Sequence, residues 1–133
     1  MKKTKQQQME DLFLEMYNEL EKTHKFAVEI RSEFILGEAT TAEYASYIKY
    51  FIKRVSLISK AASRLDVPDT NIYKEDFNFL LKNLNIALDQ MKNHAGTATD
   101  CNTEITCKSL IKIFKEKFKS ILSEQEIEEA ITL

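Results

Sequence analysis

Mostly apolar residues recur at alternating steps of four and three along the first quarter of the chain. The positions are Met9, Phe13, Met16, Leu20, Thr23, Ala27, Ile30 and Phe34. This 3.5-residue period is typical of helices that pack nearly parallel to one another. Gly37 follows the last position, and glycine readily adopts the left-handed conformation that closes a helix. The pattern therefore predicts a first helix of about 32 residues that ends at Gly37.

A second helix is predicted to begin at Thr40, because Thr40 and Glu43 match the capping-box pattern of a helix start. Its apolar side has the same period and consists of Tyr44, Ile48, Phe51, Val55, Ile58, Ala62 and Leu65. Its opposite side is polar and consists of Lys49, Lys53, Ser56, Lys60 and Ser63. Pro68 prevents the helix from continuing into the next segment.

The rest of the chain repeats this arrangement. A third helix is predicted from Tyr73, Phe77, Leu80, Leu84, Ala87 and Met91, and it ends near Gly96. A fourth helix carries Cys107, Leu110, Ile111, Phe114, Phe118 and Ile121 on one side, and Lys108, Lys112, Lys115 and Lys119 on the other. Ser123 and Glu126 match a further capping box, which predicts a short fifth helix over residues 124–131.

Four long amphipathic segments joined by short connections predict an all-α fold. We expect an antiparallel, up-down-up-down four-helix bundle with a long first helix and a short C-terminal fifth helix. The whole chain, residues 1–133, is short enough to form a single domain. Two glycines and one proline are too few for the many turns of a strand-rich fold.

Charge and composition narrow the classes of partner and compartment. The net charge of −2 provides no general attraction to nucleic acid. No apolar run approaches the roughly 20 residues of a membrane-spanning helix, and no secretory signal pattern is present. Two cysteines six positions apart do not form a disulfide framework. We therefore expect a cytoplasmic protein that binds no nucleic acid.

Motifs for catalysis or metal binding are missing from the sequence. No Glu-x-x-His pair, nucleophile motif or phosphate-binding glycine loop occurs. His94, Cys101 and Cys107 are possible zinc ligands, but their spacing is irregular and a fourth ligand is lacking. We expect no catalytic residue, no metal and no cofactor.

His24 lies beside a seam position of the first helix and has two interpretations. It is either a partly buried, hydrogen-bonded structural histidine or an axial ligand to a haem iron. With Gly37, Thr40 and Tyr44 it resembles the start of the haem oxygenase and thiaminase-like superfamily, over residues 20–65. The resemblance implies a helical domain that holds haem or another flat apolar ligand near His24.

The sequence also departs from that superfamily. The glycine-rich distal helix of haem oxygenases is missing. Tyr50 and Phe51 stand where thiaminase-like members place an aspartate after the tyrosine of the second helix.

The first helix is predicted to extend beyond its neighbours, which leaves an apolar stripe of Met9, Phe13 and Met16 to be covered. A second copy of the chain or another protein is expected to cover it, with Tyr47 and Tyr50 beside the stripe. Cover from within the chain by Ile127, Ala130 and Ile131 is a smaller alternative.

Complete apolar seams, with no polar residues expected to converge inside, predict a non-enzymatic interaction protein of the inhibitor, immunity or regulatory adaptor type. Self-association as a homodimer is one form that the interaction can take. The lysines Lys108, Lys112, Lys115 and Lys119 are either a solvated face or a binding face for an acidic partner or a membrane surface.

Overall fold

The computed structural model describes residues 2–92, 103, 105, 107–109, 112, 116 and 119–131, without the side chains of 130 and 131. Its helices are α1 (Lys5–Ile35), α2 (Thr41–Ser63), α3 (Lys74–Lys92) and α5 (Glu124–Ile131). Between α3 and α5, the described residues from Thr103 to Glu116 are also helical. The described part of the chain contains no strand, which confirms the predicted all-α class.

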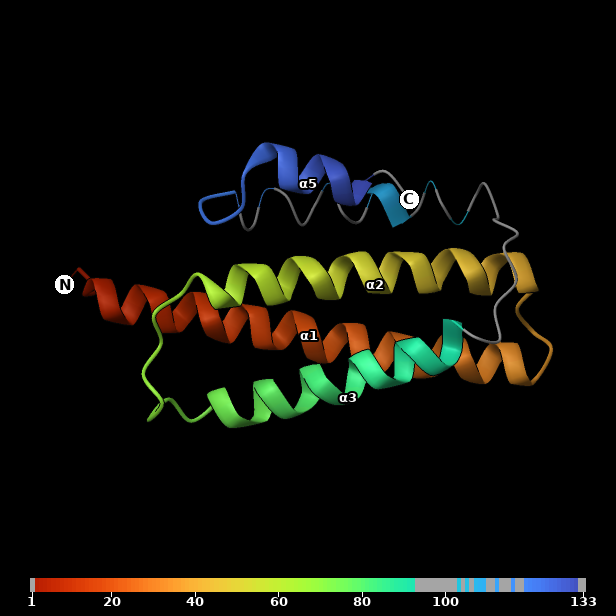
Figure 1. The fold of residues 1–133 in the computed structure, drawn as a ribbon, viewed down its shortest axis with the longest axis horizontal. Coiled ribbons are helices and arrows are strands. Elements are labelled where there is room, and N and C mark those ends of the chain that lie inside the picture. Colours follow the sequence, from red (N-terminus) through yellow and green to blue (C-terminus); the bar gives the residue numbers. More distant parts are fainter. Residues whose placement is uncertain are drawn as a thin grey trace.

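The three long helices lie side by side, and each runs opposite to the one before it in the chain (Figure 1). Helix α2 contacts α1, α3 and α5, and is therefore the central helix of the described structure. None of the described helices is long and apolar enough to cross a bilayer.

The helix ends form where the sequence places their caps. The Thr40 hydroxyl accepts a hydrogen bond from the Glu43 backbone N–H at 3.1 Å, and the Glu43 side chain accepts one from the Thr40 N–H. Gly37 has φ = 78°, and the Glu38 N–H donates to the Glu33 carbonyl at 2.8 Å. Together with the bond from the Gly37 N–H to Phe34, this is a Schellman motif, which satisfies the last carbonyls of α1.

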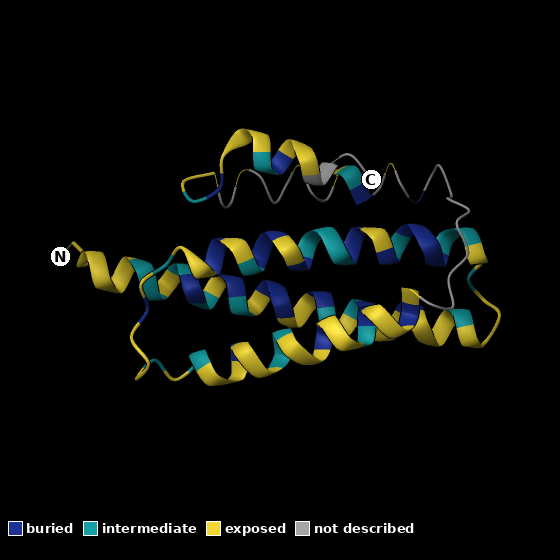
Figure 2. Ribbon diagram, viewed as in Figure 1, coloured by how far each residue is buried: buried dark blue, intermediate teal, exposed yellow. Residues whose placement is uncertain are grey.

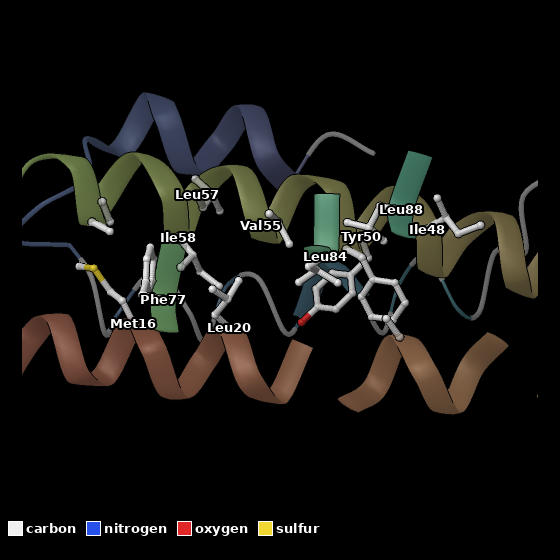
Figure 3. Close-up of a cluster of buried hydrophobic side chains, with 14 of the residues drawn as sticks. Met16, Leu20, Ile48, Tyr50, Val55, Leu57, Ile58, Phe77, Leu84 and Leu88 are labelled. Carbon is white, nitrogen blue, oxygen red and sulfur yellow. The ribbon is translucent and has the colours of Figure 1, made fainter. Parts of the chain in front are cut away.

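The predicted seams form a shared core between α1, α2 and α3. Figure 3 shows its central part, where Met16 and Leu20 of α1 meet Ile58 of α2 and Phe77 of α3. Phe51, Leu84 and Leu88 belong to the same cluster and are fully buried. Dense burial of this kind is the main stabilising contribution for a helical domain.

Helix α1 is the longest, as predicted, and has 31 residues or about 46 Å. Its N-terminal turns extend beyond α2 and α3 (Figure 1). Helix α5 packs on α2, not on this extension, and its Ile127 is fully buried in the core cluster. Of the residues named as the smaller alternative cover, Ile127 therefore packs away from the extension, and the side chains of Ala130 and Ile131 lie outside the described residues.

Candidate functional site

The apolar stripe expected on the first helix is largely internal. Met9 is half-buried, whereas Phe13 and Met16 are buried in the core. The Phe13 ring packs on Phe77 of α3 with 4.9 Å between ring centroids. We expected Phe13 and Met16 to be exposed, and this was wrong because the N-terminal half of α3 covers them. Binding of a partner to these residues stays a prediction, and a partner would reach Phe13 only if α3 moved away.

The two tyrosines predicted to lie beside the stripe are also internal. Tyr50 is buried, and its hydroxyl points toward α1 (Figure 3). Tyr47 is half-buried and meets the ring of Phe26 edge-on at 5.3 Å. The two residues fix α1 against α2, and they do not form one surface with Met9.

A cluster of charged and polar side chains lies between α1 and α2 around Arg54. Its Nε donates to the Thr23 hydroxyl at 2.8 Å, and its Nη1 donates to the Tyr50 hydroxyl at 3.0 Å. Nη2 forms an ion pair with the Glu19 carboxylate, and the two side chains are 12% and 9% exposed. The Thr23 hydroxyl in turn donates to the Glu19 backbone carbonyl at 2.8 Å. The interior therefore contains converging polar groups, and the expectation that it holds none was wrong.

The sequence does contain a signal for this cluster. Glu19 and Thr23 are four residues apart on α1, and Tyr50 and Arg54 are four apart on α2, so each pair shares one side of its helix. Glu19 and Arg54 also flank the seam residues Leu20 and Val55, where interhelical ion pairs form in coiled coils. The 4-3 hydrophobic pattern alone did not identify the pair of Glu19 and Arg54, because both residues fall just outside it.

The electrostatics of the cluster keep Tyr50 neutral. Burial raises the pKa of the Tyr50 phenol above its ordinary value, and the nearby Arg54 guanidinium partly opposes this shift. The phenol therefore accepts the Arg54 hydrogen bond as a protonated group at neutral pH. Because the opposite charges of Arg54 and Glu19 are paired within the chain, the cluster is suited to fixing the register of α1 against α2.

A small pocket opens beside this cluster, and its walls are Lys22, Thr23, Phe26, Tyr50 and Arg54. Its volume of about 220 Å³ lies below the roughly 300–1,000 Å³ of ordinary ligand sites. His24 is half-buried and is not among the residues that line this pocket. Haem or another flat ligand near His24 stays a prediction.

No group of three or more His, Cys, Asp or Glu side chains suited to a metal occurs among the described residues. Cys107 is buried, whereas His94 and Cys101 lie outside the described residues.

The predicted lysine face is described in part. Lys112 and Lys119 are exposed, Lys108 is half-buried, and Lys115 lies outside the described residues. Lys119 is 3.3 Å from the Glu116 carboxylate, so part of its charge is balanced locally. An acidic partner or membrane surface for this face stays a prediction.

Helix α3 carries an apolar stripe on its outward side that the sequence analysis missed. Ile72 lies two residues before the helix, and Phe79 and Ile86 follow at intervals of seven. Their exposed fractions are 77%, 69% and 48%. Phe79 and the buried Leu88 are nine residues apart, or two and a half turns, so they lie on opposite sides of the helix. Figure 2 shows that α3 stays exposed along one side.

Charged residues border this outward stripe. Glu75, Asp76 and Asp89 are the exposed acidic residues of α3, and Lys82 and Lys92 are its exposed basic residues. Burial is the largest cause of the raised pKa of the Tyr17 phenol. The carboxylates of Glu21 on α1 and Asp76 on α3 raise this pKa further. Glu21 of α1 and Asp76 of α3 therefore both act on the Tyr17 phenol.

No family model, no curated protein and no solved structure matches the chain. The likeness to the haem oxygenase and thiaminase-like superfamily therefore rests on the four sequence positions alone.

Proposed function

We propose that the chain is a small interaction protein, of the inhibitor, immunity or regulatory adaptor type, that binds a protein partner through the outward side of α3. The observation that carries this proposal is the exposure of Phe79 and Ile86, two large apolar side chains seven residues apart on α3, with the exposed Ile72 in the turn before the helix. We call Ile72, Phe79 and Ile86 the α3 stripe. Large apolar groups are costly to leave in water, at about 25 cal/mol per Å².

The stripe is not needed for the core. The buried side of α3 already contributes Phe77, Leu84, Leu88 and Met91 to the shared cluster. Aromatic residues such as Phe79 are enriched at protein interfaces, where they supply much of the binding free energy.

A second exposed apolar group lies at the C-terminal end of α1 and consists of Val28, Ile35 and Leu36. Ile35 is the last residue of α1 and Leu36 is its C-cap, so only Val28 lies within a straight stretch of helix. In α3, Phe79 and Ile86 both lie within the helix and Phe79 is aromatic, which is why we assign the interaction to α3.

A photo-crosslinking amino acid placed at position 79 tests the proposal, with the same amino acid at position 28 as the matched control. In extracts of the source cells, position 79 should give a discrete crosslinked protein that position 28 does not give. If position 79 gives no crosslink, or the same pattern as position 28, the α3 stripe is not the binding surface.

We also infer that the described helical residues between Thr103 and Glu116 belong to the fourth helix of an up-down-up-down bundle. The support is that Thr103 and Cys107, four residues apart on one side, are buried while Ile105 and Lys112 are exposed. A disulfide engineered between this segment and α2 would test the arrangement, because it forms only if the two helices are neighbours.

A further inference from the structure

The residues that border the α3 stripe indicate what kind of partner it binds. This inference rests on the proposed function. We propose that the α3 stripe binds a basic amphipathic helix, in which apolar residues at heptad spacing are flanked by lysine or arginine.

The spacing of the stripe favours a helical occupant. Phe79 and Ile86 are seven residues apart on α3, or about 10.5 Å along its axis, and Ile72 lies in the turn before the helix. A helix packed nearly parallel to α3 presents its own apolar residues at the same interval, and the two rows can interdigitate. An extended peptide repeats its side chains every two residues and does not match this interval.

The polar residues between the apolar ones favour a narrow contact. Asn83 and Gln90 are exposed and lie on the same side of α3 as Phe79, within about 40° around the helix axis. The partner therefore meets a single row of apolar side chains with amides beside it, which is typical of a modest interface with a fixed register.

The charges that border the stripe determine which sign of charge a partner must carry. Glu75, Asp76, Asp89 and Lys82 all lie within about 80° of Phe79 around the axis of α3, whereas the exposed Lys92 lies about 140° away. An anionic membrane or a nucleic acid is repelled by such a border, whereas a helix flanked by lysines is attracted.

The test uses the full chain and two synthetic three-heptad helical peptides with the same leucine seam. One peptide has lysine at the flanking positions and the other has glutamate. We expect the lysine peptide to bind about tenfold or more tightly than the glutamate peptide at low salt. This preference should shrink in about 1 M NaCl, where the charges are screened.

Variants locate the binding on the molecule. Phe79→Glu should abolish binding of the lysine peptide, although it adds a favourable negative charge, because the central apolar contact is lost. Val28→Glu is the matched control, since it makes the same change at an exposed apolar residue of α1, and it should bind as the wild type does. Circular dichroism and thermal melting should show both variants folded. The double variant Glu75→Lys/Asp76→Lys should reverse the preference toward the glutamate peptide.

Several results would overturn the inference. Equal binding of the two peptides, binding that survives Phe79→Glu, or loss of binding in Val28→Glu each contradict it, as does the absence of binding. If light scattering shows a wild-type dimer that Phe79→Glu converts to a monomer, the occupant is a second copy of the chain. A crosslinked partner at position 79 that is not basic would refute the inference and leave the proposed function standing, whereas no crosslink at 79 would refute both.

Discussion

Helices α2 and α3 carry similar apolar side chains but bury them to very different extents. Helix α2 contacts three other helices, and its buried residues include neighbours in sequence such as Tyr50 and Phe51. Helix α3 buries one side and leaves Phe79 and Ile86 of its other side in water. The same amphipathic period therefore occurs in a central helix and in a helix with one side exposed to solvent. An apolar residue off the seam is structural on a central helix, and it is available to a partner on a peripheral helix.

The two helices also differ in how they use charge. On α2, Arg54 is nearly buried and is held by Glu19, Thr23 and Tyr50. On α3, the charges border the exposed stripe and remain in solvent. Buried charges specify how the chain packs on itself, and exposed ones select what approaches it.

The largest loss of stability is expected on the α2 side of this comparison. Arg54→Met removes the buried cation beside Glu19 and should lower the free energy of unfolding by about 3–5 kcal/mol. Urea denaturation followed by circular dichroism measures the loss. The double variant Glu19→Gln/Arg54→Met should recover most of it, because no buried charge is then left. Wild-type stability of Arg54→Met would show that the cluster is not formed in solution.

A loss of similar or slightly smaller size is expected on the buried side of α3. Leu84→Ala should cost about 2–5 kcal/mol, since it leaves a cavity in the shared core. Ile86→Ala, two residues further on the outward side, should change the same free energy by less than about 0.5 kcal/mol. If the two variants melt alike, the assignment of the two sides of α3 is wrong.

A smaller effect is expected where α2 begins. Thr40→Ala removes the hydroxyl that caps the helix and should lower the free energy of unfolding by about 1 kcal/mol. The exposed neighbour Thr41 provides the control, because Thr41→Ala removes a hydroxyl without a capping role. Equal effects of the two changes would argue against the capping box.

The helix positions and caps could be predicted from residues close in sequence, but the contacts between helices could not. Gly37 ends α1 and the Thr40 capping box starts α2 because both depend on residues close in sequence. The burial of Phe13 depends instead on Phe77, 64 positions away, which sets where α3 lies. The same holds for Glu19 and Arg54, whose pairing is set by the register between two helices.

The α3 stripe was missed for a related reason. Phe79 and Ile86 are visible in the sequence as apolar residues off the predicted seam, but a peripheral helix and a central helix look the same in one sequence. Tyr47 and Tyr50 on α2 were also off the seam, and the structure buries Tyr50 while it leaves Phe79 exposed. Which helix is central is a property of the assembled fold.

The most direct measurement is the free energy of unfolding of Phe79→Ala relative to the wild type, by urea denaturation. If the outward side of α3 is reserved for a partner, removal of this ring should leave the value within about 0.5 kcal/mol of the wild type. A loss of about 2 kcal/mol or more would place Phe79 under cover from the chain itself, and would contradict the assignment of the α3 stripe as an interaction surface.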